Sequence, residues 1–310
     1  MKILITGCAG FIGSNLAKKF LSGGESILGV DNFITCGKKN VSRLLKEKNF
    51  TFLKIDITSS ESIKELAKFK FDQIYHLASP TGVPNCERLG EEMLLTNSIG
   101  TFNILEIAQK NKASFLLASS SEVYGDPQIF PQSEEYFGNV NPIGFRSPYE
   151  EGKRFAENLT ISYFRKFNVN VRIARIFNTY GPNMASDDQR VIPRFLNALT
   201  KNLQLEVYGD GSQTRTFCYV DDLVDGLILI MEKGTSGEIY NLGSDKEVSI
   251  KKLASFFLDL TGAKRKVKFV DELPLDPKRR KPLLSKIKKL GWSPKTTLET
   301  GLKKIIQNPK

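Results

Sequence analysis

A glycine-rich turn near the amino terminus constrains the fold more than any other feature of this chain. The apolar run Lys2 to Thr6 leads directly into 7-GCAGFIG-13, and that turn opens a segment with helical spacing. Glycines without a β-carbon let backbone N–H groups approach a pyrophosphate, and the positive end of the helix favours the negative charge. A strand, a glycine turn and a helix in this order predict a dinucleotide site, although glycine also serves such turns for steric reasons alone. The predicted contacts are Gly7, Gly10, Phe11, Ile12 and Gly13.

Strand-like and helical segments alternate through the first part of the chain, which is typical of a doubly wound parallel sheet. After residue 178 the alternation loosens, and glycine and proline mark loops. We therefore expect an α/β fold, with a Rossmann-type domain over residues 1–178 and a smaller lobe over residues 179–310. The expected strands are 2–6, 26–30, 50–55, 73–76, 115–118 and 171–176, with a strand near 238–241 returning to the sheet; the expected helices are 11–21, 60–69, 91–110 and 149–167.

Two aspartates end expected strands where a dinucleotide would lie. Asp31 can accept hydrogen bonds from ribose hydroxyls and repels a 2′-phosphate, so the sequence favours NAD over NADP; a helix-capping role is the alternative. Asp56 is expected to reach the adenine ring. His76 is the only histidine, which excludes a Ser-His-Asp triad, and we expect a structural role for it. The other predicted cofactor contacts are Asn32, Phe33, Ile57, Leu77, Ala78, Ser79 and Asn97.

Tyr149 and Lys153 stand four residues apart, so their side chains share one face of the expected helix 149–167. A nearby ammonium favours the phenolate, and we expect Lys153 to lower the pKa of Tyr149 from about 10 towards neutrality. Such a phenol is a general base for an alcohol. Together with the glycine turn and Ser120, the pair predicts hydride transfer at a hydroxyl group.

The net charge of +11 invites a nucleic-acid-binding interpretation, but the position of the charge argues against it. Residues 263–310 contain 15 Lys or Arg against 4 Asp or Glu, which accounts for the whole excess. No aromatic residues interleave the basic runs, so we expect a solvated basic face and no nucleic-acid partner. The four cysteines fit no metal-ligand spacing, and no metal is expected. The apolar runs are too short for a secretory signal or a membrane span, so we expect a cytoplasmic protein with no membrane partner.

Several motifs occur in an order that resembles the extended short-chain dehydrogenase/reductase family. They are the glycine turn, 76-HLAS-79, 97-NSIGT-101, 120-SSEVYG-125, the Tyr149/Lys153 pair, 177-FNTYGP-182 and 289-KLGWSP-294. The resemblance implies that residues 1–178 bind NAD and that residues 179–310 bind a nucleotide sugar. Within the family, the chain resembles the UDP-glucuronate decarboxylases at 122-EVYGDP-127, 131-PQSEEY-136, 141-NPIG-144, 151-EGKRFAE-157 and 174-ARIFNTYGP-182.

The resemblance implies that UDP-glucuronate is oxidised at C4, loses CO2 from the resulting β-keto acid and is reduced again to UDP-xylose. In this reaction Tyr149 takes the C4 hydroxyl proton, Ser120 holds that oxygen and Lys153 orients the nicotinamide ribose. The family gives Glu122 a base or positioning role, and Arg280 a proton-donor or carboxylate-facing role. Because the pKa of arginine exceeds about 12, we expect Arg280 to act through a water molecule or as a charge stabiliser.

The same resemblance implies substrate contacts in both parts of the chain. Arg146 suits a carboxylate. Ser121 stands where 4,6-dehydratases carry an acid, which disfavours that reaction because a hydroxyl is a poor proton donor. The predicted contacts to UDP, through amides, stacking and diphosphate pairing, are Asn178, Arg190, Val191, Tyr208, Gln213 and Arg215.

Two departures from the decarboxylase pattern leave the sugar open. Residues 81–93 replace a tyrosine-bearing loop, and Leu283 stands where an acidic residue is usual. The alternatives are a UDP-sugar 4-epimerase or C4 oxidoreductase, a 4,6-dehydratase and a non-catalytic NAD-sensing or nucleic-acid-binding protein. The expected helices 91–110 and 149–167 carry apolar residues beyond one stripe, and with the family resemblance this predicts a homodimer.

Overall fold

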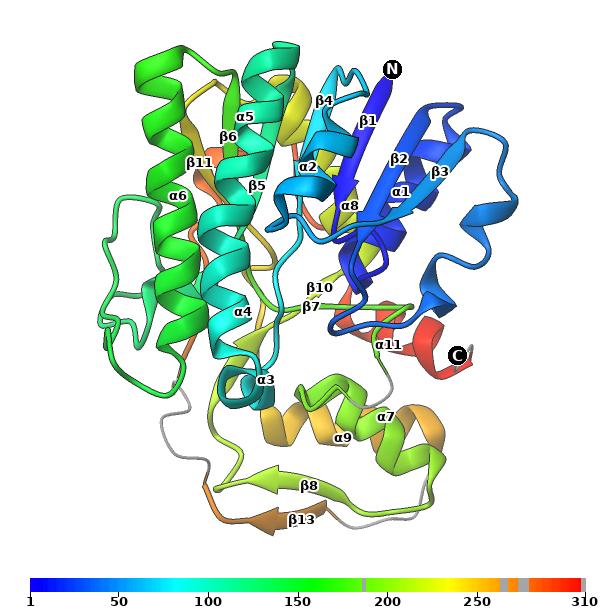
Figure 1. Ribbon diagram of the computed structural model, residues 1–310. Helices are drawn as coiled ribbons and strands as arrows, with labels where there is room; N and C mark the ends of the chain where they lie inside the picture. Colours follow the sequence, from blue (N-terminus) through cyan, green and yellow to red (C-terminus); the bar gives the residue numbers. More distant parts are fainter. Residues whose placement is uncertain (186–187, 263–266, 273–278, 308–310) are drawn as a thin grey trace.

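A seven-stranded parallel sheet forms the centre of the protein in the computed structural model, which describes residues 1–185, 188–262, 267–272 and 279–307 (Figure 1). The strand order is β11-β6-β5-β4-β1-β2-β3, and every neighbouring pair is parallel. The order reverses between β1 and β4, as in doubly wound nucleotide-binding folds. The strands are β1 (Lys2–Thr6), β2 (Ser26–Asp31), β3 (Phe50–Lys54), β4 (Gln73–His76), β5 (Ser114–Ser120), β6 (Val171–Ile176) and β11 (Glu238–Leu242).

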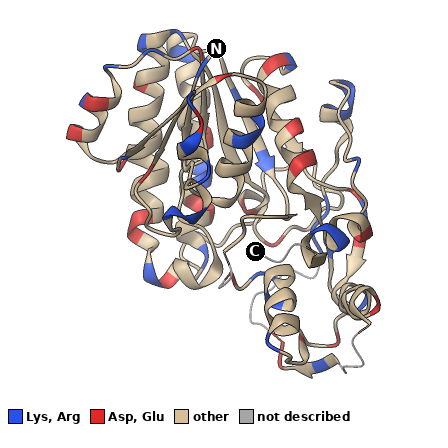
Figure 2. Cartoon of the chain, turned by 90° about the vertical axis from the view of Figure 1, so that its right-hand side faces the viewer, with Lys and Arg blue, Asp and Glu red and all other residues tan. Residues whose placement is uncertain are grey.

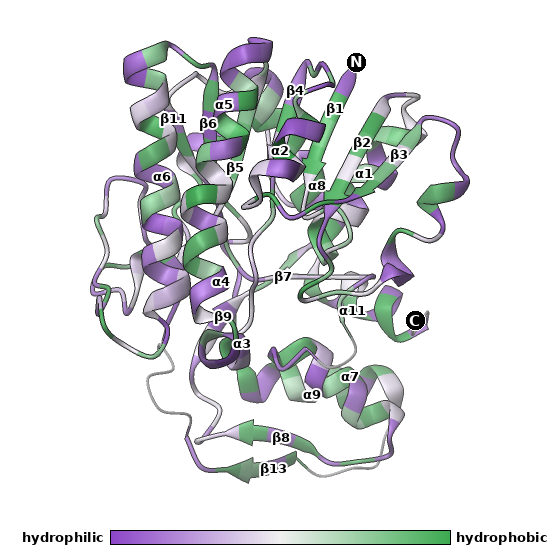
Figure 3. Cartoon of the chain, viewed as in Figure 1, coloured by the Kyte–Doolittle hydropathy of each residue, from purple (hydrophilic) through white to green (hydrophobic). Residues whose placement is uncertain are grey.

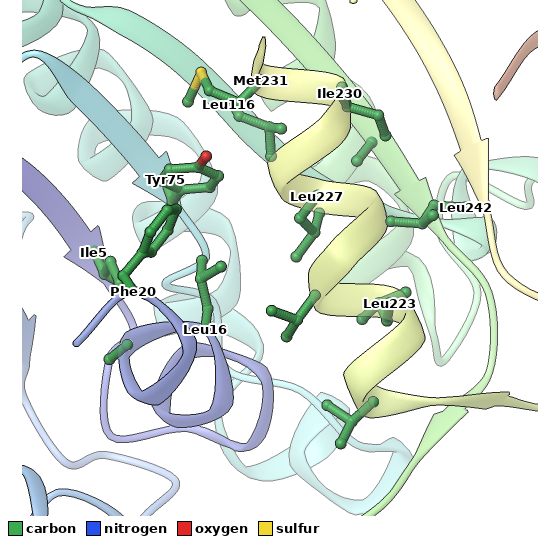
Figure 4. Close-up of a cluster of buried hydrophobic side chains, with 14 of the residues drawn as sticks. Ile5, Leu16, Phe20, Tyr75, Leu116, Leu223, Leu227, Ile230, Met231 and Leu242 are labelled. Atoms are coloured by element: carbon green, nitrogen blue, oxygen red, sulfur yellow. The ribbon is translucent and has the colours of Figure 1, made fainter. Parts of the chain in front are cut away.

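Helices cover both faces of this sheet (Figure 1). Because successive side chains of a strand alternate between faces, Ile3 and Ile5 of β1 join a buried cluster with α1 and α8, whereas Leu4 joins a cluster with α5 and α6. Figure 4 shows the α1–α8 cluster, in which the rings of Phe20 and Tyr75 have centroids 5.3 Å apart. The helices are α1 (Phe11–Ser22), α8 (Val220–Lys233), α5 (Thr101–Asn111) and α6 (Ser147–Phe167).

The expected Rossmann-type fold is confirmed, and the strand predicted near 238–241 returns to the sheet as β11, beside β6. One helix prediction is wrong in detail. The expected helix 91–110 is divided into α4 (Gly90–Leu95), a π-helical turn (Thr96–Gly100) and α5. This turn contains the buried Asn97, and wide turns of this kind often occur at functional sites.

A smaller lobe lies below the sheet in Figure 1, with its own hydrophobic core. Phe195 and Phe257 meet at the centre of this core, with ring centroids 5.5 Å apart and planes nearly perpendicular. Figure 3 shows hydrophobic residues concentrated on the strands of the main sheet and on the inner sides of helices in both parts. The lobe contains α7 (Val191–Thr200), α9 (Ile250–Thr261), β8 (Leu205–Tyr208), β13 (Val267–Val270), β9 (Thr214–Thr216) and β12 (Glu247–Ser249).

The carboxy-terminal segment is fastened to α8. The Asp222 carboxylate accepts hydrogen bonds from the backbone N–H groups of Lys295 and Thr296 at 3.1 and 2.7 Å, and the Trp292 indole donates to the Asp222 carbonyl at 3.0 Å. This segment therefore packs into the α1–α8 cluster through Trp292 and into the core of the lobe through Leu302 and Ile305. The remaining elements are α2 (Ser60–Leu66), α3 (Val83–Arg88), β7 (Thr179–Tyr180), β10 (Cys218–Tyr219), α10 (Ser285–Lys289), α11 (Leu298–Gln307) and 3-10 turns at Lys38–Asn40, Leu44–Lys46 and Ser121–Tyr124.

Candidate active site

The residues predicted for cofactor binding and catalysis gather at one edge of the sheet. Parallel strands all end at the same edge, so the glycine turn after β1, Asp31 at the end of β2 and Ser120 at the end of β5 lie along one line. α6 carries Tyr149 and Lys153, and it packs against the end of β5. This edge therefore combines a nucleotide cradle with the predicted catalytic groups.

The glycine turn needs its glycines for three different reasons. Gly7 has φ +68°, and a β-carbon there would lie 2.8 Å from the backbone nitrogen of Ala78. A β-carbon on Gly13 would lie 2.2 Å from the Gly7 carbonyl, so any side chain would force α1 away from the turn. At Gly10 the nearest atom to such a β-carbon, among the described residues other than its chain neighbours, is the Gly7 carbonyl oxygen at 3.1 Å. A β-carbon at Gly10 would thus occupy the space through which a pyrophosphate approaches the backbone.

Asp31 joins this turn to the loop after β2. Its Oδ2 accepts a hydrogen bond from Ala9 N at 3.0 Å, and its Oδ1 accepts one from Phe33 N at 2.8 Å. Burial raises the pKa of Asp31, although these two backbone bonds act in the opposite direction. Carboxylate oxygens accept more than one hydrogen bond each, so both remain suitable for ribose hydroxyls. Asp56 lies close by, because its Oδ2 accepts from Asn32 Nδ2 at 3.1 Å.

The floor of the cradle is held by a buried polar network. Thr6 Oγ1 accepts hydrogen bonds from the backbone nitrogens of Leu77 and Ala78, both at 3.1 Å, and lies 2.8 Å from His76 Nδ1. Burial lowers the pKa of His76 to about 3, so this imidazole is neutral and structural. The other predicted cofactor residues of this edge pack into the two sheet clusters: Phe11, Ile12 and Leu77 with α1 and α8, and Ile57 and Ala78 with α5 and α6.

Asn97, on the π-helical turn, contacts the loop that follows β4. Its Nδ2 donates to Ser79 Oγ at 2.9 Å and to the Met93 carbonyl at 2.8 Å. Its Oδ1 is buried and has no hydrogen-bond partner among the described residues. A buried acceptor of this kind suits a ligand donor, because an unsatisfied buried polar atom is costly.

Ser120, Tyr149 and Lys153 lie together at the end of β5. The Ser120 side chain lies near enough to Tyr149 to lower the pKa of the phenol, and its Oγ accepts a hydrogen bond from Glu122 N at 3.2 Å. Lys153 Nζ donates to the Ala118 carbonyl at 2.9 Å and lies 5.9 Å from the centre of the Tyr149 ring. Burial lowers the pKa of Lys153 to about 7, while the charge of Glu157 acts in the opposite direction.

The prediction that the pKa of Tyr149 is lowered is wrong, because the groups of the protein itself raise this pKa. Burial raises the pKa of the Tyr149 phenol to about 12. The Ser120 side chain and the Arg190 charge lower this pKa, whereas the Glu122 charge raises it. The lysine is itself buried and has a pKa of about 7, so it holds its full charge only below that pH. Positive charge from a bound group would favour the phenolate.

Glu122 is held between two arginines that are distant in sequence. Arg146 Nη2 donates to Glu122 Oε2, and Arg280 Nη1 donates to Glu122 Oε1. Burial alone would raise the pKa of Glu122, but Arg280 and Arg146 hold it below its usual value. Arg146 also pairs with Glu150, whose carboxylate Oε1 lies 3.5 Å from Arg146 Nε, and burial raises the pKa of Glu150. We call Glu122, Arg146 and Arg280 the arginine–glutamate cluster.

Arg280 is the most buried member of this cluster, with 5% of its surface exposed. Its Nη2 donates to the Gly125 carbonyl at 3.1 Å, whereas its Nε is buried without a hydrogen-bond partner in the part of the chain that the structure describes. Two guanidinium groups thus face Glu122, and Glu150 lies beside one of them. The buried Arg280 donor suits an anionic ligand group.

The structure brings the residues predicted to contact UDP together less completely than it does the predicted cofactor residues. Arg190 is exposed and pairs with Asp188, at 2.5 Å from Arg190 Nη2 to Oδ2. Tyr208 has the Arg194 guanidinium 4.1 Å above its ring, and its carbonyl accepts from Gln213 Nε2 at 2.8 Å. The others are dispersed: Val191 begins α7, Arg215 lies in β9 and donates to the Thr214 carbonyl, Asn178 follows β6, and Ser121 is buried beside Ser120.

The sequence did not reveal a buried ion pair between α6 and β6. Arg175 donates from Nε and Nη2 to the two carboxylate oxygens of Glu157, at 2.9 and 2.8 Å, and Ser119 Oγ donates to the same carboxylate at 2.5 Å. Glu157 follows Lys153 by one helical turn on α6, and Arg175 interrupts the apolar run of β6. The charged residue on β6 could have indicated this pair in the sequence, because a charge on an otherwise buried strand needs a partner of opposite charge.

The basic carboxy-terminal region is matched by acidic residues of the fold. Lys281 pairs with Glu247 at 3.2 Å, Lys288 pairs with Asp245 at 2.7 Å, and Lys286 pairs with Glu238. Figure 2 shows Lys and Arg beside Asp and Glu on both parts of the molecule. Part of the positive charge of this region is therefore neutralised by acidic residues of the protein itself.

The described residues form neither a metal centre nor a helix that could cross a membrane. Within the described ranges, no three His, Cys, Asp or Glu side chains are grouped so that they could hold a metal ion. Likewise, none of the described helices has the length and apolar character that a membrane crossing requires.

Residues 3–243 match the model of the NAD dependent epimerase/dehydratase family, so the chain belongs to that family. A UDP-glucuronic acid decarboxylase 1 from Xenopus tropicalis is 46% identical over 306 residues, covering 98% of this chain and 71% of the relative. UDP-glucuronic acid decarboxylase 3 from Arabidopsis thaliana is 44% identical over 304 residues, covering 97% and 87%. A solved UDP-glucuronic acid 4-epimerase variant from Bacillus cereus, in complex with NAD and UDP-4-deoxy-4-fluoro-glucuronic acid, is 30% identical, with a TM-score of 0.89 and coverage of 99% and 98%.

These comparisons confirm the predicted family, its NAD dependence and the predicted fold.

Proposed function

We propose that the protein decarboxylates UDP-glucuronate to UDP-xylose, with NAD regenerated in each cycle. The observation that carries this proposal is the arginine–glutamate cluster, which lies within electrostatic reach of Tyr149. The Arg280 Nε, buried without a hydrogen-bond partner among the described residues, suits the carboxylate at C5 of the sugar. Relatives at 46% and 44% identity are UDP-glucuronic acid decarboxylases, which supports the same substrate.

The cofactor residues fit NAD. The space beside Gly10 and the unpartnered Asn97 Oδ1 are features that a dinucleotide would fill, and the Asp31 carboxylate suits two ribose hydroxyls while repelling a 2′-phosphate. Bound NAD would accept a hydride from C4 of the sugar, return it after CO2 has left, and supply a positively charged ring beside Tyr149. We propose that residues 1–178 hold this cofactor and that residues 179–310 hold the nucleotide sugar.

In this proposal Tyr149 takes the proton of the C4 hydroxyl while Ser120 holds the same oxygen. Lys153 already donates one N–H to the Ala118 carbonyl, so two remain for the nicotinamide ribose. C4 oxidation would create a ketone β to the carboxylate, and CO2 would leave because its bonding electrons delocalise into that ketone. The resulting enolate would take up a proton at C5 before C4 is reduced again. Arg146 would bind the carboxylate, Glu122 would hold Arg146 and Arg280 in position, and Arg280 would stabilise the charge that develops.

A UDP-glucuronate 4-epimerase is the second candidate. The Bacillus cereus structure of that class shares the fold at 30% identity and its ligand carries the same carboxylate. Both reactions begin with hydride removal at C4. They differ after that step, since an epimerase must keep the C5 carboxylate and turn the keto sugar over. A 4,6-dehydratase is disfavoured because Ser121 stands where an acid is required.

The deciding experiment is incubation of the purified protein with UDP-glucuronate labelled with 13C at C6, without added oxidant. We expect labelled CO2 and UDP-xylose by NMR, because oxidation and reduction balance within one cycle. Labelled UDP-galacturonate without CO2 would favour the epimerase, and an unchanged sugar nucleotide would overturn the proposal.

We also propose that the protein forms a homodimer through α4 and α6. These helices lie side by side and expose apolar residues such as Leu94, at 43%, and Phe155, at 52%. Both residues line the same surface groove. Light scattering should give a dimer for the wild type and a monomer for Phe155→Glu. A wild type that is monomeric at micromolar concentration would contradict this proposal.

We also propose that the protein is located in the cytoplasm. All four cysteines are free thiols, as expected in a reducing compartment. Fractionation of source cells should find the protein with the cytoplasmic enzymes, and recovery with the secreted proteins would contradict this location.

A further inference from the structure

The short segment that carries Arg280 is held in an extended arrangement by residues outside the cluster. Arg279 and Lys281 flank Arg280, and both side chains reach the same carboxylate, Glu247. The Arg280 side chain points the other way, to Glu122. Side chains one residue apart on an extended segment face opposite sides, so fixing the two neighbours on one side directs Arg280 to the other.

Glu247 is built to hold this segment. Its Oε1 and Oε2 accept from Arg279 Nε and Nη2 at 2.6 and 2.8 Å, and Oε1 also accepts from Thr214 Oγ1 at 3.1 Å. With Lys281 Nζ at 3.2 Å, three side chains converge on one carboxylate. The Arg279 hydrogen bond, followed by those of Lys281 and Thr214, lowers the pKa of Glu247 to about 2 despite partial burial. The group therefore stays ionised throughout the pH range in which the protein works.

Gln132 fastens the other side of the segment. It is fully buried, and its side-chain Oε1 accepts from Lys281 N at 2.8 Å. Its backbone N donates to the Lys281 carbonyl at 2.9 Å, and its carbonyl accepts from Leu283 N at 2.7 Å. Asn241 Nδ2 from β11 then donates to the Gln132 carbonyl at 3.0 Å, which anchors this contact to the main sheet.

We propose that Glu247 and Gln132 are positioning residues that aim Arg280 at Glu122 and at the substrate carboxylate. The inference rests on the proposed decarboxylation, and it adds two residues that touch neither the cluster nor the predicted substrate. A guanidinium on a long side chain has many rotamers, and charge stabilisation at a reacting centre requires that it be held before the reaction begins. Glu247 sits on β12 of the lobe, so it also links the lobe to the carboxylate end of the site.

The test compares Glu247→Ala, Glu247→Gln and Glu247→Asp in the full-length protein with NAD bound. Glu247 is partly exposed, at 19% of its side chain, so its replacement is compatible with folding. The matched control is Glu206→Gln, which removes another exposed ion pair of the lobe, to Lys268 at 3.1 Å. The measurements are kcat and KM for CO2 release from UDP-glucuronate, the affinity for NAD, and the affinities for UDP-glucuronate and UDP-glucose.

We expect Glu247→Ala to lower kcat by about 100-fold, because misplacement of a catalytic group by about 1 Å has an effect of that size. Affinities for NAD and UDP-glucose should not change, Glu247→Asp should recover most of the rate, and Glu206→Gln should behave as wild type. Unchanged kcat in Glu247→Ala would overturn the inference. An equal loss of NAD and UDP-glucose binding would also overturn it, because that result would indicate a general structural role.

A failure of the proposed function is distinguishable from a failure of this inference. If the wild type releases no CO2, the decarboxylation is wrong, and the binding measurements then decide the positioning role. Glu247→Ala should still lower the preference for UDP-glucuronate over UDP-glucose, since only the former carries the carboxylate that Arg280 faces. A preference equal to that of the wild type would overturn the inference.

Discussion

Replacement of Lys153 by methionine should stabilise the nucleotide-free protein while it abolishes catalysis. The Lys153 ammonium is buried, with 3% of the residue exposed, and burial lowers its pKa from 10.5 to about 7. The unfolded chain keeps the proton up to about pH 10.5, whereas the folded protein releases it near pH 7. Between these values the unfolded state binds more protons, so the stability of the wild type rises with pH.

The size of this stability difference follows from the lowered pKa of Lys153. Between pH 6 and pH 10, linkage gives the wild type about 4 kcal/mol of stability that Lys153→Met cannot gain. At pH 6 the methionine variant should therefore be the more stable protein, by about 1 to 3 kcal/mol after subtraction of about 1 to 3 kcal/mol for the hydrogen bond to Ala118. At pH 10 this advantage should be gone.

Urea unfolding of the wild type and Lys153→Met at the two pH values measures the difference directly. Lys18→Met, which removes an exposed lysine of α1, is the control and should give the same stability difference at both pH values. If the free-energy difference between wild type and Lys153→Met is also independent of pH, the Lys153 ammonium is not held at a desolvation cost and the reasoning is refuted.

Two further substitutions test the cradle and the base. Tyr149→Phe should lower the rate of CO2 release by about 100- to 10,000-fold with unchanged NAD affinity, because it removes only the proton acceptor; a rate close to that of the wild type would exclude Tyr149 as the base. Gly13→Ala should destabilise the protein by about 1 to 3 kcal/mol in thermal unfolding and weaken NAD binding, since its β-carbon would lie 2.2 Å from the Gly7 carbonyl. Gly37→Ala is its control, with no atom within 4 Å of the added carbon, and equal effects of the two substitutions would contradict the steric argument.

Local patterns predicted the sheet and the glycine turn because both depend on neighbouring residues. β1, β4 and β6 have the expected bounds, since apolar runs and the glycines after β1 determine where these strands begin and end. The π-helical turn at Thr96–Gly100 was missed because its sequence has the same periodicity as the helices on either side.

The chemistry of the site depends on contacts that sequence spacing does not contain. Arg280 and Glu122 are 158 positions apart, and only the folded chain brings them into direct contact. The family resemblance singled out each residue but not the pair. The Tyr149 pKa was predicted in the wrong direction for the same reason, because burial is set by the whole fold whereas the neighbouring lysine is visible in one helical turn.

The position of β11 has a consequence for synthesis of the protein on the ribosome. β11 (Glu238–Leu242) completes one border of the sheet, and α8 (Val220–Lys233) fills the cluster against β1 and α1. A nascent chain that has emerged only as far as β6 exposes an unpaired strand and an uncovered apolar face, and both features promote association with other chains. Translation must therefore pass through much of the lobe before the nucleotide-binding half can close, and this interval is when the protein most needs protection by chaperones.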